Sequence, residues 1–265
     1  MLSTSQAEDA QATSIAQFPA TCTLERGDDF LSPDENWLAT QCGNQKEYFN
    51  LEIVDRTGKH WSVQYKDYGP GGLGPVYWTA DQAYLFFDST VGYEGGGTCF
   101  YGFGTGALYR IELKTGKVST ILPATPTVDG YLFAFSPTGR RLAYSGSYGP
   151  VILDLRTGQE LNLDVGDDAF GYLTWSPDGS ELAYSTYRSV QSGNDYVVKS
   201  SAIKIYSTLR QTTRTIFDLP DNLLTIEDWS ATNGLKIGSQ NPDFNTNYLW
   251  IDPVSGAQTI INPQP

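Results

Sequence analysis

The chain has 265 residues, 30 of them acidic and 17 basic, which gives a formal net charge of −13 at pH 7. That charge would repel nucleic acid and anionic membrane surfaces, and the sequence has no basic stripe to offset it. No segment approaches the ~18 consecutive apolar residues of a spanning helix, so no transmembrane segment is predicted. A neutral or cationic partner is compatible with the charge.

The first 20 residues are rich in Ala, Gln, Ser and Thr, and they lack the basic and apolar regions of a signal peptide. We expect residues 1–20 to form a flexible tail, and a short docked helix is the alternative. The composition fits a lead-in from which a signal sequence or lipid anchor has been removed, so the natural protein is expected to be anchored or exported through that segment. Residues 21–265 are expected to form one all-β domain.

One short pattern recurs five times along the rest of the chain. It reads aromatic-Ser-Pro-Asp-Gly-x-x-Leu-Ala-Tyr, with its best copies starting at Phe135 and Trp175 and a third at Leu31. Decayed copies start at Trp78 and Trp229. The copies are 40 to 57 residues apart, near the ~40–50 residue period of a propeller blade.

A second pattern follows each copy of the first, an alternating apolar run that in most repeats ends in a Thr-Gly or Ser-Gly turn. Alternation with a period of two predicts strands, and a short Gly-containing connection predicts a hairpin. Each repeat therefore yields four strands. The five blades are expected near residues 28–64, 75–122, 130–163, 171–219 and 225–262.

The combination of Trp-Ser-Pro-Asp-Gly-x-x-Leu-Ala-Tyr with an Asp-Leu-x-Thr-Gly hairpin resembles the WD-like repeat of the TolB-like β-propeller family, over roughly residues 20 to 262. The resemblance implies an all-β propeller of four-stranded antiparallel blades. Members of that family usually have six blades, whereas five copies occur here. We therefore expect a single five-bladed propeller, with a six-bladed ring as the alternative.

The resemblance indicates an extracytoplasmic protein of bacterial type, secreted or periplasmic. It does not identify a function, because the repeat occurs in periplasmic translocation components, peptidase gating domains and unassigned secreted proteins.

Three cysteines are present. Cys22 lies where the first strand of the first blade should begin, and Cys42 lies where the second strand should end. Because these strands are antiparallel around the first turn, their ends approach each other, and the sequence predicts a Cys22–Cys42 disulfide. Cys99 is left over in a Gly-rich loop, where we expect a free thiol.

Loop lengths predict where a ligand binds. The turns between the first and second and between the third and fourth strands are short, whereas the connections between second and third strands, at 88–107, 187–201 and 240–247, are long. The connection at 65–74, between two blades, is long too. Both kinds of long connection emerge on one face of a propeller, and elaborated loops normally carry the binding residues. We expect a protein, peptide or glycan ligand to contact Tyr68, Tyr93, Tyr101, Phe103, Asp129 and Asp168.

Catalytic patterns are weak. The single histidine, His60, lies beside a tight turn, and no Cys/His spacing suits zinc. No catalytic residue, metal or cofactor is therefore predicted, and a non-catalytic binding or scaffold module is favoured over an enzyme. The alternative is a glycoside hydrolase, because some five-bladed propellers use acids near the central axis, here drawn from Asp29, Asp129, Asp168, Glu227 and Asp228.

Overall fold

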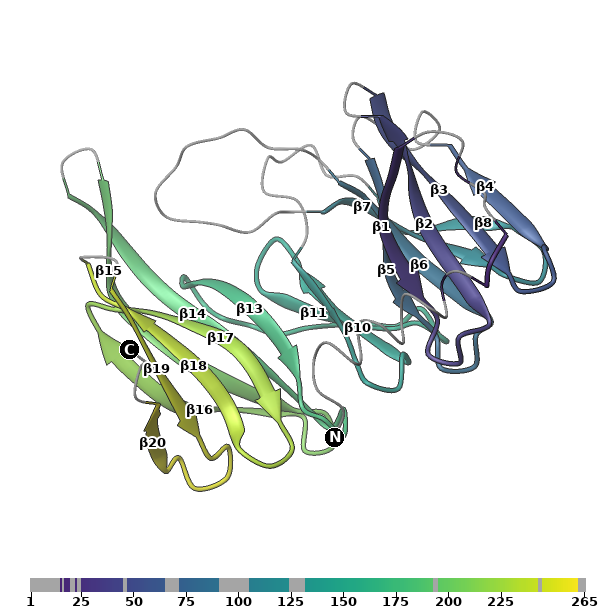
Figure 1. Ribbon diagram of the computed structural model, residues 1–265. Coiled ribbons are helices and arrows are strands. Elements are labelled where there is room, and N and C mark those ends of the chain that lie inside the picture. The colour runs from purple at the N-terminus through teal and green to yellow at the C-terminus, as the bar shows by residue number, and fades with distance from the viewer. Residues whose placement is uncertain are drawn as a thin grey trace. The chain divides into compact units, whose positions relative to one another are not determined.

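The computed structural model describes residues 15, 17–19, 22, 25–44, 47–64, 72–90, 105–123, 132–192, 195–242 and 245–261. These residues form twenty strands, arranged as five four-stranded antiparallel sheets that follow one another along the chain (Figure 1). The fold is that of a five-bladed β-propeller, as predicted, and each blade is one continuous segment. Every blade boundary falls within three residues of its predicted position.

The chain divides into two compact units, the first of which contains blades one and two. Blade one consists of β1 (Glu25–Leu31), β2 (Trp37–Asn44), β3 (Glu47–Asp55) and β4 (His60–Val63). Blade two consists of β5 (Gly72–Trp78), β6 (Tyr84–Thr90), β7 (Thr105–Glu112) and β8 (Val118–Leu122). Both blades contribute fully buried side chains to one core, including Leu51, Ile53, Leu85, Phe87 and Ile111.

The second unit contains blades three to five. Blade three consists of β9 (Phe133–Phe135), β10 (Arg141–Ser145), β11 (Pro150–Asp154) and β12 (Glu160–Asn162). Blade four has β13 (Ala169–Trp175), β14 (Glu181–Ser192), β15 (Asp195–Ser207) and β16 (Thr212–Pro220). Blade five has β17 (Leu223–Ser230), β18 (Gly234–Gln240), β19 (Thr246–Ile251) and β20 (Gln258–Ile261).

The aromatic residue that opens a motif copy packs between neighbouring blades. Trp175 of blade four lies in a core with Ala143 and Ile152 of blade three, and its indole N–H donates to the backbone oxygen of Ala134 at 3.0 Å. A buried Trp contributes a large apolar area, and truncating one to Ala typically costs about 3–5 kcal/mol. The aromatic position of the motif is therefore explained by packing between blades.

The Ser-Pro-Asp-Gly segment closes the turn between the first and second strands. In blade four, Ser176 Oγ accepts a hydrogen bond from the backbone amide of Glu181 at 2.9 Å, and Asp178 accepts one from the amide of Ser180 at 3.0 Å. Gly179 has φ +70°, a conformation that costs glycine little. The equivalent Ser or Thr contact recurs in blades one, two and three, at Ser32, Thr79 and Ser136.

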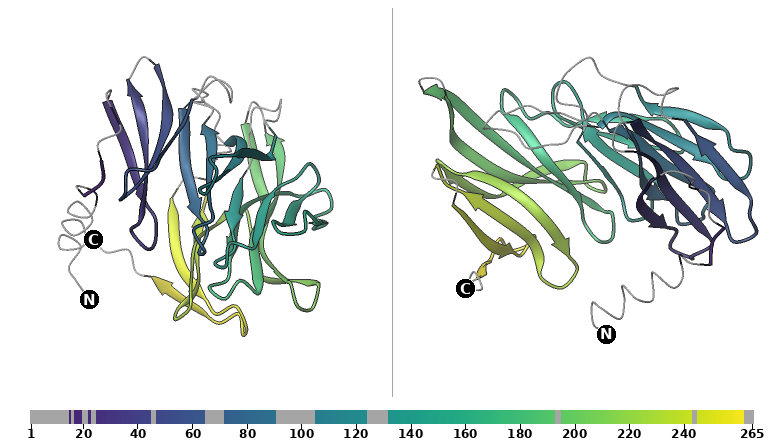
Figure 2. Two further views of the ribbon diagram at one scale, coloured as in Figure 1. Left: turned by 90° about the vertical axis from the view of Figure 1, so that its right-hand side faces the viewer. Right: turned by 45° about the horizontal axis from the view of Figure 1, so that its top comes forward.

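Blade four differs from the prediction at residues 187–201, where the sequence predicts a long loop. That prediction is wrong, because β14 and β15 continue through this segment and pair as far as Ser192 and Asp195. The last pairs of the outer strands are Ala169 with Tyr187 and Ser200 with Pro220, so beyond them the ribbon has only two strands. Figures 1 and 2 show this ribbon, in green, projecting past the rest of its sheet. Its β-branched Val190, Val197 and Val198 favour the extended conformation.

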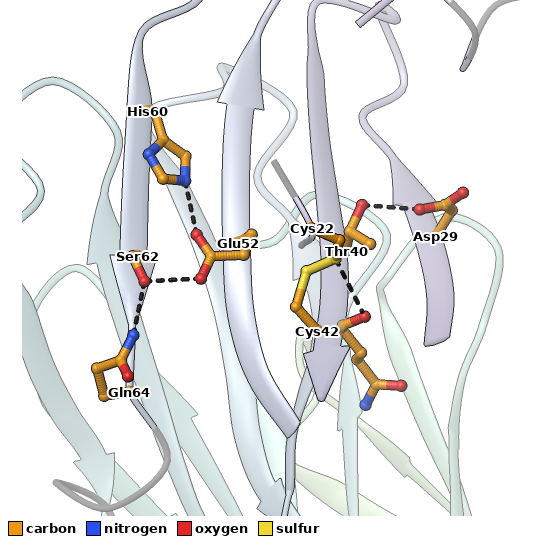
Figure 3. The surroundings of a disulfide bond; sticks show 9 residues. Cys22, Asp29, Thr40, Cys42, Glu52, His60, Ser62 and Gln64 are labelled. Atoms are coloured by element: carbon orange, nitrogen blue, oxygen red, sulfur yellow. Dashed lines mark hydrogen bonds and ion pairs between the residues drawn. A yellow bond between two sulfur atoms is a disulfide. The ribbon is translucent and has the colours of Figure 1, made fainter. Parts of the chain in front are cut away.

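The predicted disulfide is present. Cys22 and Cys42 are bonded, with their Cα atoms 5.5 Å apart, beside the first two strands of blade one (Figure 3). The end of the predicted tail packs on the same blade, where Phe18 is buried against Leu38 and Val54. Cys99 lies outside the described residues.

Candidate functional site

Asp168 is the only predicted ligand-binding residue within the described part of the chain, and it lines a pocket on blade four. The pocket has a volume of about 350 Å³ and is open to solvent. It lies at the end of the blade from which the β14–β15 ribbon projects, which is the end where the sequence predicts binding. Its lining comes from the residue before β13 and from the other three strands: Asp168, Thr186, Tyr187, Ser200, Ser201, Ala202, Asp218, Leu219 and Pro220.

The strand register assigns these side chains to the two faces of the sheet. Thr186 pairs with Ala202, which pairs with Asp218, and directly paired residues point to the same face. Ser200 lies two residues before Ala202 on β15 and therefore shares that face.

Tyr187, Ser201 and Leu219 form the neighbouring row and point to the opposite face. The hydroxyl of Ser201 is occupied there, since it donates to the backbone oxygen of Thr186 and accepts from the amide of Leu224, both at 3.1 Å. Tyr187 is only 5% exposed. The polar groups that the pocket offers are consequently those of Thr186, Ser200, Asp168 and Asp218.

One of the two pocket carboxylates is neutralised by a neighbour. Asp168 Oδ1 accepts hydrogen bonds from Arg188 Nε at 3.1 Å and from Arg188 Nη2 at 2.8 Å. Asp218 is exposed, and none of the ion pairs or hydrogen bonds between described residues involves its carboxylate. The three charged groups therefore leave the pocket with one net negative charge.

Thr186 is the least expected member of the pocket. The residue is 2% exposed, yet its hydroxyl has no hydrogen-bond partner among the described residues. Among the described residues, the fully buried side-chain atoms without a partner are Trp78 Nε1 and Tyr184 Oη, so the Thr186 hydroxyl keeps some contact with the solvent in the pocket. A polar ligand in the pocket would supply that missing hydrogen bond.

Five predicted ligand-binding residues, Tyr68, Tyr93, Tyr101, Phe103 and Asp129, lie outside the described residues, so the structure tests none of them. Sequence reasoning missed Thr186, Ser200 and Asp218. No local pattern marks these three, because they meet only through the register of β14, β15 and β16.

Two of the acids proposed for the glycosidase alternative, Asp29 and Glu227, accept hydrogen bonds within their own blades. Asp29 accepts a hydrogen bond from Thr40 Oγ1 at 2.7 Å (Figure 3), and Glu227 accepts one from Thr225 Oγ1 at 2.6 Å. Glu227 lies at a bulge in β17. Burial raises the pKa of Tyr172 on β13, and the charge of Glu227 raises it further. Tyr172 is itself unusual, with φ +55° in a β-strand.

His60 does not form a nucleophile–base pair. Its Nε2 lies 2.6 Å from Glu52 Oε2, while Ser62 Oγ donates to the other oxygen of Glu52 at 2.7 Å (Figure 3). Glu52 therefore separates the histidine from the serine, whereas a catalytic triad requires the histidine between them. These residues hold β3 to β4 on the outer side of blade one.

Within the described ranges, no group of three or more His, Cys, Asp or Glu side chains could hold a metal ion. In the same part of the chain no helix is long and apolar enough to cross a membrane.

No protein-family model matches the chain, and no curated protein does. Solved structures do match. A chain from a structural analysis of two prolyl endopeptidases is similar with a TM-score of 0.60 and 12% identity, over 98% of this chain and 41% of that one. Dipeptidyl peptidase 4 of Porphyromonas gingivalis is similar with a TM-score of 0.56 and 14% identity, over 89% of this chain and 39% of that one.

TolB from Acinetobacter baumannii is also among the similar structures, with a TM-score of 0.45 and 17% identity, over 88% of this chain and 53% of that one. Its score is too low to place this chain in the TolB-like family. The chain spans about two fifths to one half of the length of these three structures. At these identities the peptidase structures show the propeller fold alone.

Proposed function

We propose that this chain is a non-catalytic, extracytoplasmic binding or scaffold module that recognises a protein, peptide or glycan at the ribbon end of its blades. One observation carries the proposal. The pocket of blade four presents the Thr186 hydroxyl and the exposed Asp218 carboxylate, which no described residue engages, at the end of the blade where the sequence predicts binding.

The opposite end of the blades supports the proposal by contrast. Its turn residues satisfy one another, as Ser176 and Asp178 do through hydrogen bonds to nearby backbone amides. Such groups have little left to offer a partner. The Thr186 hydroxyl and the Asp218 carboxylate can bond to a ligand, because no described residue engages them.

An extracytoplasmic location is supported by the Cys22–Cys42 disulfide, since disulfides persist in oxidising compartments and are rare in the cytosol. The likeness to peptidases supports a propeller that serves in recognition, but only as an analogy of fold.

Binding can be tested by blocking the pocket on an otherwise intact protein. Ser200→Trp would fill the pocket from an exposed position, and Leu209→Trp places the same ring on an exposed turn at the other end of blade four. Both variants and the parent chain are applied to one peptide array and one glycan array. We expect Ser200→Trp to lose the ligands that the parent chain retains and Leu209→Trp to keep them.

Retention of every ligand by Ser200→Trp would refute the pocket as the binding site. Thermal unfolding of each variant serves as the folding control, because neither position is buried.

The second candidate function is glycoside hydrolysis. One observation favours it, the unusual backbone of Tyr172 beside Glu227, because strained residues cluster at active sites. Its test is hydrolysis of a panel of nitrophenyl glycosides by the parent chain and by Glu227→Gln. Activity that disappears in the variant would support this candidate, and a parent chain that cleaves none of the panel would remove it.

A further inference from the structure

We infer that the blade-four pocket binds a primary ammonium group, such as the side chain of a lysine in a peptide or protein. The inference rests on the proposed function and narrows it from three ligand classes to one. It stands on the groups lining the pocket and on their charge.

The pocket offers hydrogen-bond acceptors that no described residue occupies. Asp168 is held by Arg188, which leaves the Asp218 carboxylate and the hydroxyls of Thr186 and Ser200 without described partners. These groups supply at least three acceptors on one face of the sheet. An ammonium group has three donors and no acceptor, so it matches them in number and in charge.

The pocket lining also has an apolar part. Ala202 and Pro220 line the pocket on the same face as Thr186 and Ser200, and they form its apolar part. A lysine buries its methylene stem along apolar surface while its charged head stays with polar partners. One side chain of this kind would use both parts of the lining.

The lining suits a lysine side chain better than a sugar. Sugar-binding sites commonly present an aromatic ring face, and the only aromatic residue in the lining is Tyr187, which is 5% exposed and points to the other face. The pocket thus offers a hydroxyl-rich ligand hydrogen bonds without a stacking platform.

The charge of the pocket favours an ammonium group over an anion and over a divalent cation. The net negative charge of the pocket, within a chain of charge −13, repels an anion. The guanidinium of Arg188, 2.8 Å from Asp168, opposes a divalent cation, which would need both carboxylates as ligands.

The experiment titrates two small probes into the isotope-labelled chain and follows backbone amide shifts. The probes are α-N-acetyl-lysine methylamide and α-N-acetyl-norleucine methylamide, which share a stem and differ in the ammonium group. We expect the lysine probe to shift amides of β14, β15 and β16 around the pocket and the norleucine probe to bind about tenfold or more weakly.

Two variants and a matched control assign the contacts. Asp218→Asn removes the free charge and should weaken the lysine probe about ten- to hundredfold, and Thr186→Val removes the Thr186 hydroxyl and should weaken it several-fold. Asp221→Asn removes an exposed acid that pairs with Lys199 outside the pocket lining, and it should leave the affinity unchanged.

Equal binding of both probes, or an unaltered affinity in Asp218→Asn, would overturn the inference. So would calcium chloride displacing the lysine probe at equimolar concentration, which would make the pocket a metal site. If the lysine probe fails while array ligands still depend on Ser200, the inference falls and the proposed function stands. If no array ligand depends on Ser200 either, both fall.

Discussion

The two ends of each blade follow different rules. At the turn end, short segments of the chain satisfy their own polar groups. Six turn aspartates, Asp34, Asp55, Asp81, Asp154, Asp178 and Asp252, have lowered pKa values because nearby side chains and backbone amides donate hydrogen bonds to their carboxylates. At the other end, blade four extends a ribbon and leaves Thr186 and Asp218 without described partners.

The contrast teaches where this fold is constrained. A turn that closes on itself depends on which residue stands at each position, so its sequence repeats from blade to blade. The opposite end is free to lengthen a hairpin or open a pocket in one blade alone. Substitutions at the turn end should therefore change stability, and substitutions at the pocket should change binding.

The largest effect is expected at Gly234, the turn glycine of blade five. Its φ is +85°, and a Cβ there would lie 2.3 Å from the backbone oxygen of Ile251. Gly234→Ala should lower the free energy of unfolding by about 3 kcal/mol, from backbone strain and steric overlap together. Gly158→Ala is the control, since Gly158 has φ +72° with nothing within 4 Å of the added Cβ, and it should cost only about 1 kcal/mol. Urea denaturation measures both, and equal losses would contradict the steric part.

The next effect concerns Asp154 and pH. Partial burial opposes its ionisation, but hydrogen bonds from the Thr157 amide, the Arg140 guanidinium and the Arg156 amide outweigh it and lower the pKa of Asp154 to about 2. A lowered pKa means that ionised Asp154 stabilises the folded state above pH 3.8. This contribution, about 2 kcal/mol at pH 7, is lost as the pH falls from about 4 to 2.

Asp154→Asn should accordingly be less stable than the parent chain at pH 7 and nearly equal to it at pH 2. The stability difference is measured by urea denaturation across this range. A difference that does not shrink on acidification would contradict the assigned role of the charge.

A direct comparison of the two ends uses one hydroxyl from each. Ser176 is 5% exposed and its Oγ accepts from the Glu181 amide and donates to Asp178 at 2.6 Å, whereas the Thr186 hydroxyl has no described partner. Ser176→Ala should cost about 1–2 kcal/mol, because it leaves the partly buried amide of Glu181 without its acceptor. Thr186→Val should be neutral within about 0.5 kcal/mol or stabilising. Equal losses in thermal unfolding would remove the distinction between the ends.

The smallest effect is expected for the ion pair at the pocket. Arg188 is 61% exposed and Asp168 26% exposed, and exposed pairs of this kind contribute about 0–1 kcal/mol. Arg188→Gln should change the free energy of unfolding by less than about 1 kcal/mol. Because it frees the Asp168 carboxylate, it should raise the affinity for the lysine probe. A loss of affinity would show that Arg188 positions the pocket rather than neutralises it.

The sequence by itself determined the features that depend on neighbouring residues. The hydrogen bond that closes the Ser176 turn joins two residues five positions apart, so the whole turn lies within one short motif. The five copies of that motif gave the number of blades. The Cys22–Cys42 disulfide was predictable for a related reason, since both cysteines flank one hairpin whose turn the motif locates.

The tertiary structure decided what happens at the other end. Residues 187–201 combine many polar residues with two tyrosines and three valines, a composition shared by binding loops and by exposed strands, and only cross-strand pairing selected the ribbon. Thr186 and Asp218 are far apart in the chain and come to flank Ala202 on one face of the sheet because each pairs with it. Hydrogen bonding between strands sets that register. A local sequence pattern does not reveal it, because neither strand carries residues that mark its partner.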